Sequence, residues 1–338
     1  MGSAKTSLIK RRPPTDVVGL SIGALPNGRV SAVRLQMKGG QPELVAAGVL
    51  ELPGTLPSDW ESARKSVVWS LPQAFQAPHA ALVATSPGAV LRLTQRTAPA
   101  AGTQALATNG IRQMVGLVSP PDLCLETALP EYQVLWLSRL LPEGHQPTAC
   151  SIQTAPCAML NAPLAVPAFT QAGETALVLF VEAGQTRLVA YYRGRPVLVR
   201  EQALGYETVD DTLAAGLGIE RQLLQSMLEE HLVDPLPILE PLLQPLFRQI
   251  GLAADYVAQR FEANPSCGFV IGLPAHQAAL WPICAERAGC TITFSIPDPL
   301  AAFTHAKGFK PEAPAATARE LWPALCGALA VLMEARDE

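Results

Sequence analysis

The sequence contains few charged and few aromatic residues, and this limits the classes of partner that it can bind. Charged residues make up 16% of its 338 residues and aromatic residues 6%, with a formal net charge of -4. No basic stripe interleaved with aromatic residues is present, so we expect no nucleic-acid surface. Since 49% of the residues are hydrophobic, the chain has enough apolar material for two domains, each with its own core.

Common signatures of metal, disulfide and membrane chemistry are also missing. The 7 cysteines are irregularly spaced and form no C-x-x-C, which predicts free thiols in a reducing compartment. The histidines are scattered, so no zinc or other metal site is expected, and we find no G-x-S-x-G, H-E-x-x-H or Walker A motif. No apolar run is long enough to span a bilayer and no signal peptide is present, which predicts a cytoplasmic protein.

What the sequence does contain is a succession of strands in its first half. Residues 1–16 are predicted to be a flexible basic tail. β-Rich segments separated by turn residues predict three antiparallel strands at 17–20, 30–36 and 43–50. A helix over 58–75 is predicted next, with Ser58 and Glu61 forming a capping box, and strands are expected within 79–87 and 88–96. This order is typical of an RNase H-like core.

The region after Pro99 departs from that order. We predict helix over 103–118, a strand-like segment at 131–141, and a short strand followed by a helix within 147–169. An inserted subdomain is placed at about 100–134. Proline, alanine and glycine concentrate over 163–173, which places a domain boundary there, with the first lobe covering 17–165 and the second 166–338.

The second half repeats the pattern of the first. "LVLFVEAGQTRLVAYY" matches "VVGLSIG…RVSAVRL" in character, and each reads as a strand, a turn and a second strand. Further segments follow, predicted as a strand at 195–204, helices at 206–218, 220–232 and 239–262, a strand at 267–274, a helix at 276–289, a strand at 291–297 and a closing helix at 318–335. A repeat on this scale predicts two RNase H-like lobes with a cleft between them, the α/β architecture of actin and hexokinase.

Several of these stretches together resemble one family. They are "VGLSIGALPNGRVSAVRL", "LVLFVEAGQTRLVAYYRGRPVLVREQALG", "LGIERQLLQSMLEE", "LEPLLQPLFRQIGLAADYVAQRF", "GFVIGLPAHQAALWPICAERAG" and "DPLAAF". Their order and spacing resemble the PilM family, actin-like ATPases of type IV pilus assembly, over about residues 17–334. The cytoplasmic domain of type II secretion L proteins is similar too. The resemblance implies an actin-like ATPase fold with two hairpins that face each other and hold phosphates.

The first hairpin departs from the pattern that the resemblance implies. An aspartate followed by Ile-Gly is usual there, and its carboxylate helps to hold magnesium, but this sequence has Ser21 before Ile22 and Gly23. Pro26 removes a backbone N–H from the turn, which leaves Asn27 as its polar side chain. Ser21, Gly23 and Asn27 are therefore only weak candidates for phosphate contact.

The second hairpin keeps part of the pattern that the resemblance implies, whereas the adenosine turn departs from it. Glu182, Gly184, Gln185 and Thr186 stand where the resemblance implies an aspartate, a glycine and hydroxyl residues, so a carboxylate and a hydroxyl survive. In the adenosine turn, usually Gly-Gly, Gly272 is followed by "LP", whose side chains fill the space for the base. These departures predict weak or lost binding of ATP with magnesium.

The resemblance implies a scaffold that binds the N-terminal cytoplasmic tail of a PilN-like single-span protein of the inner membrane, together with other assembly platform proteins. Two alternatives stay open, an active actin-like ATPase with unusual ligands and a type II secretion L-type scaffold.

Asp210 and Asp211 are interpreted as acidic residues at a helix start, where they interact favourably with the helix dipole, and His276 as a polar residue at the start of another helix. Tryptophans 69, 136, 281 and 322 are expected in cores.

Overall fold

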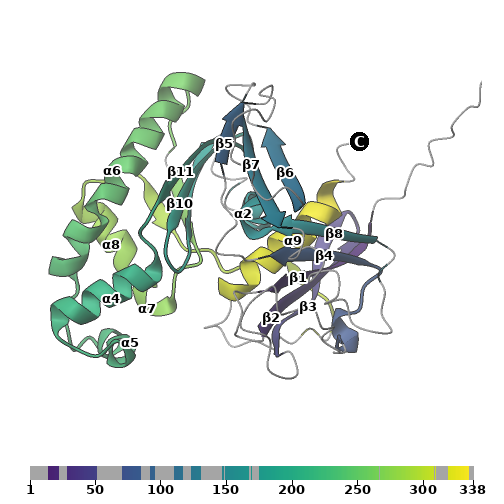
Figure 1. The fold of residues 1–338 in the computed structure, drawn as a ribbon, viewed down its shortest axis with the longest axis horizontal. Coiled ribbons are helices and arrows are strands. Elements are labelled where there is room, and N and C mark those ends of the chain that lie inside the picture. Colours follow the sequence, from purple (N-terminus) through teal and green to yellow (C-terminus); the bar gives the residue numbers. More distant parts are fainter. Residues whose placement is uncertain are drawn as a thin grey trace, which may run out of the picture.

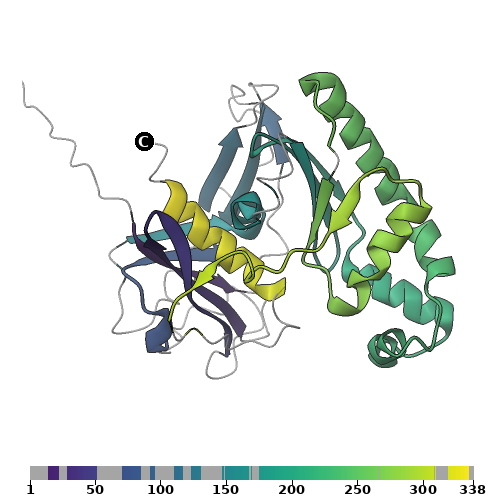
Figure 2. The same cartoon turned by 180° about the vertical axis from the view of Figure 1, so that it is seen from behind.

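The protein has two α/β halves that lie side by side, with helix α9 (Trp322–Glu334) between them (Figure 1). The view from behind shows the same arrangement (Figure 2). The computed structural model describes residues 14–22, 29–51, 71–84, 92–95, 110–116, 123–130, 147, 149–166, 169, 175–265, 267–307, 309 and 319–334.

The first sheet has six strands in the order β14-β3-β2-β1-β4-β8. Their bounds are β1 Asp16–Ile22, β2 Arg29–Lys38, β3 Gln41–Glu51, β4 His79–Ala84, β8 Ala149–Thr154 and β14 Thr304–His305. Strands β1, β2 and β3 pair antiparallel, whereas β4 pairs parallel with β1 and β8 parallel with β4. The prediction of three antiparallel strands followed by a further strand is confirmed.

The second sheet is built on the same plan. Its strands run in the order β11-β10-β9-β12-β13. Their bounds are β9 Thr175–Val181, β10 Thr186–Tyr192, β11 Arg195–Gln202, β12 Cys267–Ile271 and β13 Thr293–Ser295. The first three again pair antiparallel, and β12 pairs parallel with β9 on its far side. The internal repeat predicted from the sequence is therefore confirmed in the topology.

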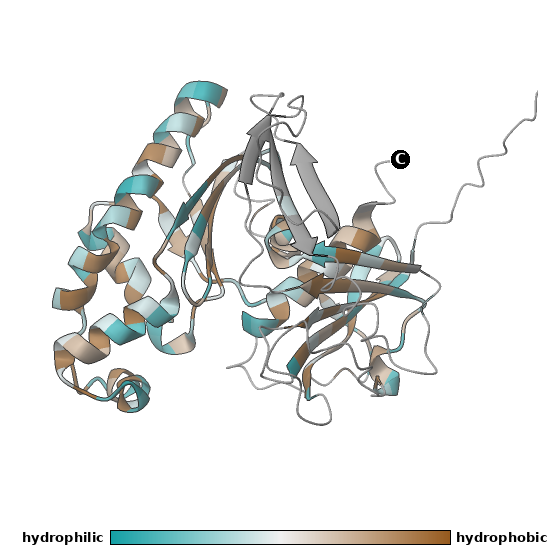
Figure 3. Cartoon of the chain, viewed as in Figure 1, coloured by the Kyte–Doolittle hydropathy of each residue, from teal (hydrophilic) through white to brown (hydrophobic). Residues whose placement is uncertain are grey.

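Helices cover the outer face of the second sheet. They are α4 (Tyr206–Leu217), α5 (Arg221–Glu229), α6 (Leu236–Phe261), α7 (Ala275–Ala278) and α8 (Leu280–Arg287). Leucines 177, 179 and 188 of the sheet pack against them in one core that also holds Trp281, as expected for that tryptophan. Hydrophobic and hydrophilic residues alternate along α6, in keeping with one buried face (Figure 3).

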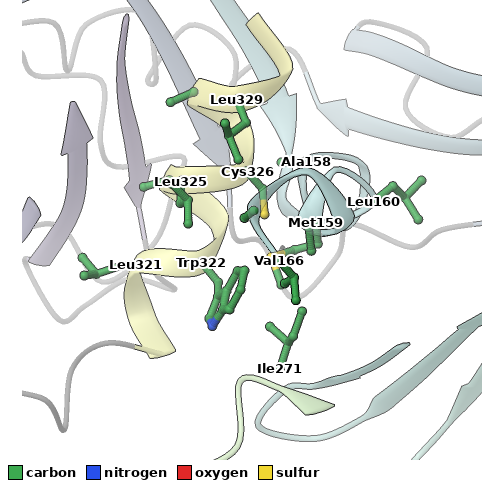
Figure 4. Packing of buried hydrophobic residues seen from close by; sticks show 14 of the residues in the cluster. Ala158, Met159, Leu160, Val166, Ile271, Leu321, Trp322, Leu325, Cys326 and Leu329 are labelled. Atoms are coloured by element: carbon green, nitrogen blue, oxygen red, sulfur yellow. The ribbon is translucent and has the colours of Figure 1, made fainter. Parts of the chain in front are cut away.

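The space between the two sheets is filled by a single apolar core. Short helix α2 (Ala155–Met159), the 3-10 helix η2 (Ala162–Ala165) and α9 contribute to it together with both sheets. The ring of Trp322 points toward Ile271 of the second sheet and Met159 of α2 (Figure 4). Because this core joins both halves, they are not independent bodies connected only by linkers.

Helix α9 lies very close to the first sheet. A Cβ added to Gly19 of β1 would overlap the carbonyl of Ala324, and one added to Gly327 of α9 would overlap the side chain of Val83. Two glycines thus allow helix and sheet to approach each other. Residues 322–334 belong to the second half in sequence yet complete the first half in space, as does β14, which pairs with β3. The division of the chain at 165/166 stays a prediction.

On the outer face of the first sheet, Phe75 and Leu71 pack against Val18 and Leu82. Phe75 ends the 3-10 helix η1 (Gln73–Phe75). Most of the helix predicted over 58–75, with its capping box and Trp69, lies outside the described residues, as do the segment 131–141 and Trp136. The short strand and helix predicted within 147–169 are confirmed as β8 and α2.

A separate three-stranded sheet belongs to the first half, and it corrects one prediction. Strands β5 (Arg92–Gln95), β7 (Leu123–Pro130) and β6 (Gly110–Gly116) pair antiparallel in the order β5-β7-β6. The helix predicted over 103–118 is wrong at 110–116, which is strand. Apolar residues at helical spacing suggested the helix, but glycines at both ends, β-branched residues and pairing with β7 favour the strand. The sheet also begins with β5, before the start of the insertion predicted at residue 100.

Candidate functional site

The first hairpin offers little chemistry at its strand end. Ser21 is the second-last residue of β1 and is only 4% exposed, paired in register with Ser31 of β2 and Val83 of β4. Its buried position carries a hydroxyl where the resemblance implies a carboxylate. Gly23, Pro26 and Asn27 lie outside the described residues.

In the second hairpin the surviving carboxylate is already bound by its neighbours. The backbone N–H of Glu182 donates to the carbonyl of Gln185 at 2.8 Å, which closes the turn. One carboxylate oxygen, Oε2, accepts from Gln185 Nε2 at 2.8 Å, and the other, Oε1, accepts from Arg187 Nη1 at 3.0 Å. Both oxygens of Glu182 are therefore engaged within the hairpin.

Arg187 is the centre of this network. Its side chain is 1% exposed, and its Nε donates to Glu201 Oε1 of β11 at 2.7 Å. One buried guanidinium balances two carboxylates, which is the condition under which a buried charge is tolerated. Its Nη2 is buried without a hydrogen-bond partner among the described residues. The cation that neutralises Glu182 is thus supplied by the chain itself.

Further polar groups of the hairpin also have partners within the chain. The hydroxyl of Thr186 is buried and donates to the carbonyl of Leu204 at 2.5 Å. The N–H groups of Tyr206 and Glu207, at the start of α4, donate to the carbonyls of Glu182 and Ala183, both at 3.0 Å. Free N–H groups at a helix start would favour an anion, but here the hairpin backbone accepts from them.

Two glycines beside the hairpin have different reasons to be there. A Cβ on Gly205 would overlap the carbonyls of Glu182 and Ala183, so this glycine lets α4 begin directly on the hairpin. Gly184, in the turn, has open space where a Cβ would lie. Close packing therefore requires glycine at 205 and not at 184.

The predicted adenosine turn is closed by packing. Gly272 has a φ of +91°, and a Cβ there would overlap the carbonyl of Val181, so the chain itself needs this glycine. Leu273 is buried in the outer core of the second sheet, and Pro274 caps the start of α7. Both residues after Gly272 are thus used by the packing of the second lobe, and the loss of a base site stays a prediction.

Next to this turn lies a polar cluster that the sequence did not reveal. Asp210 Oδ1 lies 2.8 Å from His276 Nε2 and accepts from Gln277 Nε2 at 2.7 Å, and the same Gln277 nitrogen is 2.9 Å from the carbonyl of Tyr206. Burial raises the pKa of Asp210, but the hydrogen bonds from His276 and Gln277 outweigh it, so the net pKa is lowered. The cluster joins α4 to α7.

The helix-dipole interpretation of the aspartates is wrong in detail. The acidic residue in the first turn of α4 is Glu207, whereas Asp210 and Asp211 follow one turn later. Asp211 forms an ion pair of 3.0 Å with exposed Arg221. The polar pair His-Gln at the start of α7 was the sequence signal for the cluster, because two polar residues beside buried Leu273 need a partner.

Metal ligands, thiols and apolar helices are the remaining features of the described residues that bear on a site. No group of three or more His, Cys, Asp or Glu side chains in that part of the chain is placed to hold a metal ion. The six cysteines whose side chains are described are unpaired thiols. Nor does any helix within the described ranges have the length and apolar character needed to cross a bilayer.

A cavity of about 290 Å³ lies between α6 and the turn that precedes β13, away from both hairpins. Phe247 and Ile292 are among the residues that line it, and Arg248 also faces it. Among the described residues, its lining has no member in common with the hairpins or the adenosine turn.

Comparison with known proteins places the fold. No protein-family model and no curated protein matches the sequence. Among solved structures, the PilM-PilN type IV pilus biogenesis complex contains a chain with a TM-score of 0.60 and 17% identity, over 96% of this chain and 99% of that one. A Bacteroides thetaiotaomicron protein of actin-like ATPase fold and unknown function gives 0.45, at 8% identity over 86% of this chain and 95% of its own.

The cytoplasmic domain of EpsL, from the type II secretion system of Vibrio cholerae, gives a TM-score of 0.39 at 9% identity, over 94% of this chain and 98% of that one. The fold is an actin-like ATPase fold with a mixed α/β sheet in each of two lobes, as the sequence predicted. We call the half built on the first sheet the first lobe and the other the second lobe.

Proposed function

We propose that this protein is a scaffold of a type IV pilus or related secretion assembly platform, with weak or lost binding of ATP. It acts at the cytoplasmic face of the bacterial inner membrane, where it binds the N-terminal tail of a PilN-like single-span protein. The similar chain was solved in a complex of PilM with PilN, which supports this class of partner.

The observation that carries the loss of nucleotide binding is the internal use of Glu182. Its two oxygens already accept from Gln185 and Arg187, so a magnesium ion would compete with the buried Arg187 guanidinium for this partly exposed carboxylate. Displaced from Glu182, Arg187 would keep its ion pair with Glu201, so the cost is the loss of one charge-assisted hydrogen bond, about 2 kcal/mol. The residues present therefore do not fit a magnesium nucleotide, and we assign them no step in ATP hydrolysis.

Calorimetric titration with Mg-ATP tests this part of the proposal. We expect no binding heat at micromolar protein, since the loss of a few kcal/mol moves a micromolar site into the millimolar range. Ser21→Asp is the matched variant, because it restores the carboxylate of the first hairpin and leaves Arg187 and the adenosine turn unchanged. It should gain no ATP turnover. Tight binding by the parent protein, or turnover by Ser21→Asp, would favour the active ATPase instead.

The tail-binding part of the proposal rests on the separate sheet of the first lobe. Strands β5 and β6 are its edges in the described structure, and an edge strand has backbone groups to which an extended peptide can add. A peptide from a neighbouring single-span protein is accordingly expected to bind this part of the first lobe and not the second lobe.

Binding of tail peptides, measured by fluorescence anisotropy, tests the location. The deletion should remove 92–130 and not 100–134, because β5 belongs to the same sheet. We expect this deletion to abolish peptide binding while the circular dichroism of the remaining lobes persists. Full binding by the folded deletion variant would refute the location, and failure of every single-span pilus or secretion protein to bind would refute the role.

A further inference from the structure

Arg319 and Glu320, which are separated from α9 by Leu321, together contact both lobes. The guanidinium carbon of Arg319 lies 4.7 Å from the ring centre of Tyr206, a cation–π geometry. Its neighbour Glu320 pairs with Arg29 at 3.4 Å through Oε1 and Nη1. Tyr206 begins α4 in the second lobe, and Arg29 begins β2 in the first lobe.

Both contacts end at the hairpins. Tyr206 is fixed to the second hairpin, because its backbone N–H donates to the carbonyl of Glu182. Arg29 is the first residue of β2 and so directly follows the turn of the first hairpin. Arg319 and Glu320 therefore connect the two hairpins through side chains of the protein itself.

The segment that holds Arg319 and Glu320 is fixed in place by helix α9, which follows it. Helix α9 starts at Trp322, whose ring is in the core between the lobes near Ile271 (Figure 4). The close contact of Ala324 with Gly19 fixes the same end of α9 on the first sheet. In both cartoon views this end of α9 faces the second lobe, and the other end is directed away from it (Figures 1 and 2). Arg319 is thus presented to Tyr206 by a rigid support.

The guanidinium of Arg319 is partly buried at its contact with Tyr206. Its Nη1 is buried without a hydrogen-bond partner among the described residues. No ion pair of Arg319 is found in that part of the chain, and the Tyr206 ring is the described contact of its guanidinium. Because Arg319 as a whole is only partly buried, this contact is expected to add a modest free energy that is lost when the lobes move apart.

We propose that Arg319 and Glu320 form a built-in clasp that adds to the apolar core between the lobes and helps to keep them closed without a ligand between them. In this chain the closed arrangement is encoded by the sequence before α9. The clasp requires neither the tail peptide nor the pilus assignment, so it stands or fails separately from the proposed function.

Distances between spin labels test the clasp in the full chain. Labels go on Gln41→Cys in β3 and Glu229→Cys in α5, both exposed positions in different lobes, in a Cys150→Ser background that removes an exposed native thiol. The parent should show one narrow distance. Arg319→Gln and Tyr206→Leu should each add a longer population, with the closed-to-open ratio reduced about tenfold.

Two conservative variants serve as controls. Tyr206→Phe keeps the ring and Arg319→Lys keeps the charge, so both should retain mostly the parent distance. If Arg319→Gln is poorly folded, Tyr206→Leu compared with Tyr206→Phe carries the test alone. The charge-reversed pair Arg29→Glu with Glu320→Arg should also preserve the closed distance.

Two results would overturn the clasp. One is an unchanged distance in both Arg319→Gln and Tyr206→Leu. The other is a parent protein that is open and closes only when Mg-ATP is added. Peptide binding is measured separately by anisotropy, so loss of tail binding with an intact clasp would count against the proposed function alone.

Discussion

The two lobes share one topology but depart in different ways from the nucleotide-binding pattern that the family resemblance implies. In the first lobe the loss is visible in the residue itself, because Ser21 replaces a carboxylate. In the second lobe Glu182 and Thr186 remain, yet each is bound by its own neighbours. A residue that matches a motif is therefore not sufficient evidence for a binding site. The groups that already contact its side chain decide whether that side chain can contact a ligand.

The two sheets each contain a glycine that is closely approached, by groups of different kinds. The neighbour of Gly19 in the first sheet is the backbone of α9, whereas the neighbours of Gly268 in the second sheet are side chains. Gly19→Ala and Gly268→Ala compare the two. An added methyl at 19 meets the carbonyl of Ala324, while at 268 it meets the ring of Phe294, which can move.

We expect Gly19→Ala to lower the free energy of unfolding by about 3 kcal/mol and Gly268→Ala by about 1 kcal/mol. Urea denaturation followed by circular dichroism measures both. Equal losses at the two positions would contradict the difference in packing between the lobes.

Arg187→Met breaks the charge network of the second hairpin. It leaves the carboxylates of Glu182 and Glu201 without their cation, although both are partly exposed and gain water. We expect the free energy of unfolding to fall by about 2 kcal/mol. The control Arg200→Met, on an exposed residue of β11 with no ion pair in the described structure, should change it by less than about 0.5 kcal/mol. A similar loss in both variants would count against the network.

Asp210→Asn tests the polar cluster between α4 and α7. Because hydrogen bonds from His276 and Gln277 lower the pKa of Asp210 in spite of burial, its ionised form stabilises the folded state. That stability is complete above the pKa of the unfolded chain and is lost as the pH falls below about 4 and through the folded pKa. Asp210→Asn should lose about 1 kcal/mol at pH 7 and show a shallower decline in acid. Parallel urea titrations at pH 7 and pH 3 measure this, and an identical acid decline in both proteins would disprove the role.

Thr186→Val removes the smallest contribution. The variant keeps the shape of the side chain and loses the hydrogen bond to the carbonyl of Leu204, which should cost about 1 kcal/mol or less. Mg-ATP titration should be unaffected, because this hydroxyl already has a partner. A change in nucleotide binding without a change in stability would instead indicate that the Thr186 hydroxyl contacts a phosphate.

The sequence predicted the sheets well and the contacts around the site poorly. Strands such as β1 and β9 are almost entirely apolar and bounded by turns, so their hydrophobic pattern determines them locally. Strand β6 was mistaken for helix, because its pairing with β7 is a tertiary effect that overrides local spacing. The site networks depend on residues that are distant in sequence, such as Asp210 with His276 and Arg319 with Tyr206, and no local pattern indicates which of them meet.

The return of α9 to the first sheet affects the order in which the chain folds during synthesis. The strands and outer helices of the second lobe lie within residues 175–295 and need no later segment for their own pairing. The first lobe, although it begins at β1, lacks β14 and α9 until the ribosome has made residue 334. N-terminal domains usually fold first on the ribosome. Here we expect the C-terminal lobe to fold first, and the earliest strand, β1, to gain its covering helix last.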